Sequence, residues 1–250
     1  ISWMFITALK DDLELYQMNG RILPEAITAT SFIRIWKDYD FVLYFRNSLG
    51  VTLVAVLISL VASTLTGYGA TRFNFKGKNT FLSFILMTQM FPSIMLLVPF
   101  YKILSVYGLN NSLVGLCVVY VSFTIPFCSW MMVGYFRTIP TEIDESAAID
   151  GASHLQTFWK IALPLVKPGL VSSAIYAFIT CWNEYMFAAI LLVNDKLKTA
   201  AVAIAEMNGY YKIAWNDMMA ASLVASVPLI IAFIFMQKSF ISGLTAGAVK

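Results

Sequence analysis

Charged residues are scarce in this chain of 250 residues, in which Asp, Glu, Lys and Arg together make up 12% of the sequence. A soluble globular domain carries about 25% charged residues. Four long stretches contain none of these residue types, at 47–71, 79–101, 103–136 and 218–237. A helix needs about 20 apolar residues to cross about 30 Å of hydrocarbon. The stretches exclude a soluble domain and indicate a polytopic membrane protein.

Residues with catalytic or metal-binding chemistry are also few. The chain has three cysteines and one histidine, and the cysteines lack metal-ligand spacing. A phosphate-binding G-x-x-x-x-G-K-[ST] motif is absent, because Arg72 stands where its first glycine would precede Gly77 and Lys78. We therefore expect no catalytic residues, metal or cofactor on this chain, and any ATP hydrolysis requires another polypeptide. The net charge of +3, without a basic cluster, gives no reason to expect nucleic acid as a partner.

The apolar stretches divide the chain into spans and connecting segments. We expect an all-α membrane protein with five spans, at about 48–70, 79–101, 113–136, 169–193 and 217–237. Residues 1–9 are apolar but too short to span, and are interpreted as the tail of a truncated first transmembrane helix. Residues 10–45 then form an extracytoplasmic segment, and residues 46–250 form the membrane domain.

The distribution of basic residues predicts the orientation of the chain. The 71–79 loop holds Arg72, Lys76 and Lys78 without an acidic residue, which places it in the cytoplasm by the positive-inside rule. Alternation then puts the 137–167 segment and the C-terminus inside. The 194–216 segment falls outside although it contains three lysines, so the rule is satisfied imperfectly.

The segment at 141–164 is polar and has the pattern of a helical hairpin. Thr141 is predicted to cap a first helix with Asp144 three residues on, and Gly151 to end it in a left-handed conformation. Ser153 and Gln156 predict a capping box for a second helix. Its apolar residues recur with helical spacing and predict an amphipathic face, at Leu155, Phe158, Trp159 and Ala162. On periodicity alone, an interfacial helix that only lies on lipid is an equal alternative.

The residues of the hairpin resemble the EAA loop of permease subunits in bacterial ABC importers. That pattern runs E-A-A, then three residues to Gly, then nine intervening residues to I-x-L-P. The chain matches it except at one position, where Ser replaces the first Ala; the matching set is Glu145, Ser146, Ala147, Ala148, Asp150, Gly151, Ala152, Ile161, Leu163 and Pro164. Asn47-Ser48-Leu49, Trp182-Asn183-Glu184 and the GLTAGAVK tail at 243–250 resemble the maltose-type carbohydrate branch, and the tail its G-type permease.

The resemblance implies an ABC importer permease fold in which this hairpin is a coupling helix. It implies a multi-pass protein of the bacterial cytoplasmic membrane, with the hairpin and C-terminus in the cytoplasm. It also implies partners: a second homologous permease, two cytoplasmic ATPase subunits that bind ATP and magnesium, an external solute-binding protein and a carbohydrate substrate. Leu155, Phe158 and Trp159 would then hold the hairpin rigidly to the membrane domain.

Polar residues within the expected spans have two interpretations. Glu184 lies in an apolar stretch beside Trp182, Asn183 and Tyr185, and a charge in the membrane usually marks a cavity, a pathway or a partner. One interpretation is a substrate pathway with flat rings for sugars; the other is a hydrogen-bond network that fixes helix packing. Gln89 is a second pathway candidate, with core packing as its alternative.

Three other functions remain open on sequence grounds. A secondary transporter driven by an ion gradient predicts several acidic residues deep in the spans, and Glu184 is the one available. A polytopic membrane enzyme predicts His, Asp or Glu clustered at a membrane face. A structural assembly subunit predicts association without transport.

Overall fold

The computed structural model describes residues 1–16, 21–208 and 214–248, and the side chains of the last helix as far as residue 234. The described residues are helical and contain no β-strand. The tail motif at 243–250 lies outside the residues whose side chains are described, so nothing in the structure tests it.

Three unbroken helices are long and apolar enough to cross a membrane: α4 (Phe41–Arg72), α7 (Leu113–Arg137) and α14 (Trp215–Ala248). They coincide with three of the expected spans. Pro126 and Pro228 lie inside α7 and α14 without ending them, which is common in membrane helices because neighbours and local adjustments satisfy the freed backbone groups.

The expected span at 79–101 is not one straight helix. α5 (Lys78–Thr88) stops before Pro92, and the chain resumes in η1 (Ser93–Leu96) and α6 (Leu97–Val106). The two parts are bent by 96°. Proline lacks a backbone N–H and disfavours helix in the residue before it, which accounts for the break.

The expected span at 169–193 is also broken. α11 (Lys167–Trp182) ends near its middle, and α12 (Met186–Leu191) begins after a short gap. On the other side, the segment at His154–Leu165 meets α11 at an angle of 74°. With each of the two bent pairs counted as one span, the described helices provide up to five spans.

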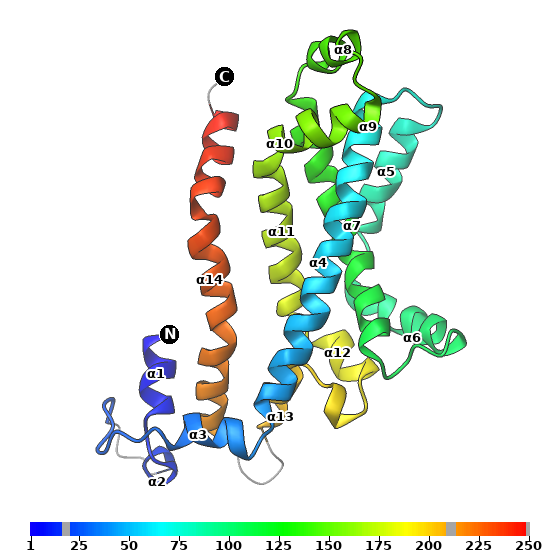
Figure 1. Ribbon diagram of the computed structural model, residues 1–250. Helices are drawn as coiled ribbons and strands as arrows, with labels where there is room; N and C mark the ends of the chain where they lie inside the picture. Colours follow the sequence, from blue (N-terminus) through cyan, green and yellow to red (C-terminus); the bar gives the residue numbers. More distant parts are fainter. Residues whose placement is uncertain (17–20, 209–213, 249–250) are drawn as a thin grey trace.

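The core forms where α4 and α7 pack closely along their length. An added Cβ on Gly67 would lie 2.7 Å from the Cβ of Met132, so only glycine permits this approach. α11 packs on both helices and on α14. Figure 1 shows α4, α7 and α11 as one group, with α14 standing beside it.

The polar segments gather at two opposite ends of this bundle (Figure 1). The hairpin with α8 (Thr141–Ile149) and α9 (His154–Thr157) stands at one end. The other end carries α2 (Asp12–Tyr16), α3 (Thr30–Lys37) and α13 (Ala200–Glu206). Between the ends, α1 (Ser2–Ala8) packs against the first half of α14, and the short η3 (Asp195–Leu197) precedes α13.

Candidate coupling hairpin

The first helix of the hairpin, α8, begins one residue earlier than predicted. Pro140 occupies the N-cap position with an extended ψ of 141°, and no side chain caps the helix. Thr141 is therefore already helical, and its predicted capping role is wrong. Asp144 makes no capping box either, because it forms an ion pair with Arg72 instead.

The turn after α8 is a Schellman motif centred on Gly151, as predicted from the sequence. Gly151 has φ +81°, its N–H donates to the Ala148 carbonyl at 3.0 Å, and the Ala152 N–H donates to the Ala147 carbonyl at 2.9 Å. This pair of bonds satisfies carbonyls that the helix end leaves free. Glycine is needed here for its conformation, because an added Cβ would meet nothing within 4 Å.

The second helix starts with the capping box that the sequence predicts. The Gln156 N–H donates to Ser153 Oγ at 3.3 Å, and the Ser153 N–H donates to Gln156 Oε1 at 2.9 Å. After one turn the chain widens into a π-helix, η2 (Phe158–Ala162), followed by α10 (Leu163–Leu165). Pro164 and Pro168 lie in the first turns of α10 and α11 rather than closing the second helix.

The π-helix divides the expected apolar face into two. Phe158 and Ala162 are buried, whereas Leu155 and Trp159 are 67% and 58% exposed. Hydrogen bonds to i+5 give a π-helix a wider turn than an α-helix, so residues spaced for an α-helix no longer share one face. The prediction that Leu155 and Trp159 hold the hairpin to the membrane domain is therefore wrong. Trp159 instead lines an open apolar groove beside α4.

Phe158 is the aromatic residue that joins the hairpin to the bundle. Its ring lies 4.9 Å from that of Tyr68 on α4, and Tyr68 lies 5.6 Å from Phe136 on α7. The ring of His154 lies 5.5 Å from Phe73, just after α4. The second half of the hairpin thus packs on two membrane helices at once.

The first half of the hairpin is joined to α4 by charge. Arg72 is the last residue of α4, and its Nε lies 2.8 Å from Oδ2 of Asp144. Its Nη2 donates to the Ile139 carbonyl at 3.1 Å. This hydrogen bond holds the segment that leads into α8. The two side chains are 7% and 19% exposed, so solvent screens the pair weakly.

The structure places most of the EAA-like residues on an exposed ridge. Ala147 is buried and Ala152 half-buried, which leaves Glu145, Ser146, Ala148, Asp150 and Gly151 exposed. Ile149, between them, is 86% exposed. Ile161 and Leu163 are half-buried in the second half, and Pro164 is exposed. The ridge thus offers carboxylates, small side chains and one protruding isoleucine to whatever covers it.

The structure separates the four neighbouring residues that are expected in the substrate pathway by their exposure and contacts. Trp182 is buried; its Nε1 donates to the Ala225 carbonyl at 3.0 Å and its ring stacks on Phe178. Glu184 lies in the gap between α11 and α12. Its carboxylate accepts from the backbone N–H of Phe187 at 2.7 Å and of Ala188 at 3.1 Å.

These contacts match the packing interpretation for Trp182 and Glu184, since both side chains satisfy backbone groups. Asn183 and Tyr185 are exposed beside them, although Asn183 Nδ2 donates to the Ile179 carbonyl at 2.9 Å. Gln89 is exposed at the break after α5, and its Nε2 donates to the Phe123 carbonyl of α7 at 3.2 Å.

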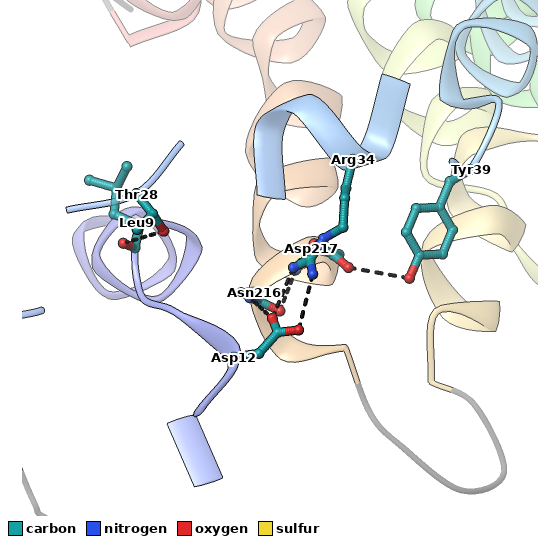
Figure 2. A network of polar contacts seen from close by, with 7 residues as sticks. All are labelled: Leu9, Asp12, Thr28, Arg34, Tyr39, Asn216 and Asp217. Atoms are coloured by element: carbon teal, nitrogen blue, oxygen red, sulfur yellow. Dashed lines mark hydrogen bonds and ion pairs between the residues drawn. The ribbon is translucent and has the colours of Figure 1, made fainter. Parts of the chain in front are cut away.

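Sequence reasoning missed a polar network at the end opposite the hairpin (Figure 2). Arg34 of α3 pairs with both carboxylate oxygens of Asp12, at 2.9 and 3.0 Å, and with Asp217 of α14 at 2.8 Å. Tyr39 donates to Asp217 at 3.2 Å, and Asn216 donates to Asp12. The only available signal was an excess of charge in the 10–40 segment, which does not identify partners.

Burial and charge both act on the titratable groups of this network. The hydrogen bond to Asp12 and the Asp217 charge raise the pKa of Arg34 above its usual value, although burial opposes them. Burial first, and the Asp217 charge second, raise the pKa of Tyr39. The arginine stays charged and the phenol neutral, as donors to two carboxylates.

Comparison with solved structures identifies proteins with a similar fold. The chain superimposes on a subunit of a bacterial ABC transporter that imports the acidic polysaccharide alginate, with a TM-score of 0.80 at 24% identity over 94% of this chain and 88% of that one. It also matches a chain of the MetNI methionine ABC transporter in an inward-facing conformation, with a TM-score of 0.66 at 20% identity, over 79% of this chain and 93% of that one. At these identities the likeness establishes the architecture alone.

Sequence comparison places the family. The inner membrane ABC transporter permease protein YcjP of Escherichia coli is 35% identical over 249 residues, which are 99% of this chain and 89% of that protein. The trehalose/maltose transport system permease protein MalG of Thermococcus litoralis is 34% identical over 99% of this chain and 90% of its own length. Residues 59–245 match the family model described as the inner membrane component of binding-protein-dependent transport systems. The chain belongs to that family.

Proposed function

We propose that the chain is one of two permease subunits of an ATP-driven carbohydrate importer and forms half of the translocation pathway. Relatives that are similar over the whole chain carry names for trehalose/maltose, diacetylchitobiose and trehalose transport. The sugars in these names are all short oligosaccharides. The second half of the pathway would come from a homologous permease.

The ridge on α8 is the observation that carries the proposal. It is exposed, acidic and built from small residues, and it stands at the end of the bundle opposite the outer segments. We assign the docking of a cytoplasmic ATPase to this ridge, through Glu145, Ser146, Ala148, Asp150 and Gly151. Ala147 and Ala152 support its backbone, and Ile161, Leu163 and Pro164 hold its second half. ATP and magnesium belong to that ATPase.

The proposal also assigns sides to the two ends. The hairpin end and the C-terminus would face the cytoplasm, as the basic 71–79 loop predicts. An external solute-binding protein would then dock at the opposite end, around α2, α3 and α13. Residues 10–45 would form the outer segment.

We assign a substrate-facing role to Asn183 and Tyr185, which are exposed at the gap between α11 and α12. An aromatic face and an amide suit the apolar and hydroxyl surfaces of a sugar. Trp182 and Glu184 would shape this gap through their backbone contacts. Gln89 would do the same at the gap after α5.

Co-purification and uptake test the proposal together. The tagged chain is expressed with its ATPase and second permease, and uptake of radiolabelled oligosaccharides is measured in proteoliposomes with the solute-binding protein outside, with and without internal ATP. We expect ATPase to co-purify and uptake to require ATP. Glu145→Lys should remove the ATPase, whereas Arg137→Gln, an exposed change on the same side, should keep it. Uptake driven by an ion gradient without ATPase would overturn the proposal.

A further inference from the structure

The ion pair between Arg72 and Asp144 connects the last residue of α4 directly to the exposed helix α8. The Asp144 carboxylate also acts on the hydroxyl of Tyr68, one turn earlier in α4. α8 has one buried side chain, Ala147, so its own packing holds it weakly. The aromatic contacts of the hairpin, through Phe158 and His154, hold the second half of the hairpin instead. Asp144 is therefore the residue through which α8 is fixed to a membrane helix.

The position of Arg72 suits the transmission of a displacement. Its guanidinium contacts Asp144 on α8 and the Ile139 carbonyl before α8, so both ends of the first turn are tied to α4. α4 in turn packs closely against α7, with Gly67 in contact with Met132 one turn before Arg72. A force applied to α8 would thus reach two packed membrane helices through one guanidinium.

We propose that Arg72 and Asp144 are a positioning pair for energy coupling: they bind neither ATPase nor substrate, and they convert displacement of α8 into movement of α4 and α7. The inference rests on the proposed docking of an ATPase at α8. The contact acts through charge: Arg72 Nε and Asp144 Oδ2 lie 2.8 Å apart, although neither atom makes an aligned hydrogen bond. Because both side chains are largely shielded from solvent, their attraction is weakly screened and can hold α8 to α4. Without the pair, α8 still docks, but its movement is no longer passed to α4.

The experiment measures communication in the assembled transporter without requiring the substrate. The complex of both permeases and the ATPase is purified in nanodiscs, and its ATP hydrolysis is measured with and without the purified solute-binding protein of the same operon. We expect Arg72→Met and Asp144→Asn each to lose most of the stimulation by the solute-binding protein, with an unchanged amount of ATPase in the complex.

Three variants separate positioning from folding. Arg72→Lys keeps the charge but not the second donor arm, and should retain part of the stimulation. The exchange Arg72→Asp with Asp144→Arg should restore more stimulation than either half alone. Arg137→Gln removes an exposed charge at the same end and should behave as the unmodified protein.

The possible outcomes separate the positioning role of Arg72 and Asp144 from the proposed docking of an ATPase. Normal stimulation in both Arg72→Met and Asp144→Asn overturns the positioning role. Loss of the ATPase from the complex, or failure of both variants to assemble, also overturns it, because the pair would then serve docking or folding. Failure of the unmodified chain to bind any ATPase instead overturns the proposed function. That result is obtained from the unmodified complex alone, so it is distinct from a failure seen only in the Arg72 and Asp144 variants.

Discussion

The two ends of the molecule each hold an arginine against carboxylates from another element, but they hold it differently. At the end that carries α3, Arg34 joins two carboxylates, and a tyrosine and an asparagine complete the network. At the hairpin end, Arg72 joins one carboxylate and one carbonyl. The first arrangement locks the ends of several helices together. The second leaves the ridge of α8 exposed and attached to α4 through one arginine, which suits a part that a partner must move.

The largest effect on stability is expected from removing a carboxylate from the Arg34 network. Asp217 is 3% exposed, and its replacement by Ala leaves Arg34 with one carboxylate and Tyr39 without its acceptor. Breaking a buried pair costs about 3–5 kcal/mol, so we expect a destabilisation of about 3 kcal/mol. Thermal unfolding of the purified complex measures it.

The exposed pair of Arg21 and Glu25 is the control for this substitution. Its side chains are 66% and 50% exposed, so Glu25→Ala should change stability by less than about 1 kcal/mol. Equal effects of Glu25→Ala and Asp217→Ala would show that the network is no more than a surface contact.

The next effect concerns the helices to which the hairpin is attached. Gly67→Val would place a Cβ 2.7 Å from the Met132 Cβ, and overpacking costs about 1–3 kcal/mol. Gly69→Ala is the control for this substitution, because its Cβ would meet nothing within 4 Å. We expect lower yield and a lower unfolding temperature for the first variant and not for the second. If Gly67→Val is as stable as Gly69→Ala, the close packing of α4 and α7 is wrong.

A smaller effect is expected at the turn of the hairpin. Gly151→Ala forces a side chain into a left-handed conformation at a cost of about 1–2 kcal/mol, without a steric clash. The cost falls on a local turn, so global unfolding should change little while ATPase co-purification decreases. A lower unfolding temperature with full ATPase binding would contradict this placement of the turn.

The smallest effect separates the two interpretations of Glu184. Glu184→Ala removes the acceptor of two backbone N–H groups at the start of α12, and loss of a helix cap costs about 0.5–2 kcal/mol. Glu184→Gln retains one acceptor and should recover most of the stability and of the uptake. If Glu184→Gln were as stable as the unmodified protein but had lost uptake, Glu184 would have a direct role in binding substrate.

The sequence predicts those parts of the fold that depend on composition or on neighbours along the chain. α4, α7 and α14 follow from uncharged stretches, and the Gly151 turn and the Ser153 capping box follow from local patterns. Pro92 predicts an interruption after α5. The size of the bend there and the break after α11 do not follow, because an apolar stretch has the same composition whether the helix is straight or bent by 96°.

The candidate site was predicted in its position but not in its contacts. The π-helix at Phe158–Ala162 changes which apolar residues are buried, and single-residue spacing does not reveal it. Arg72 was noted for its charge, and Asp144 for a capping role. Their pairing depends on how α4 and the hairpin pack against each other. The sequence does not predict this packing, because the two residues lie far apart along the chain.

Site-specific photo-crosslinking tests the central claim most directly. A benzophenone amino acid replaces Ile149, 86% exposed on the α8 ridge, and in a second variant Ile27, 78% exposed in the 10–45 segment. We predict that irradiation of membranes links position 149 to the ATPase subunit, and that position 27 gives no such adduct. Adducts of position 149 with lipid alone, or with a protein outside the cell, would contradict the account.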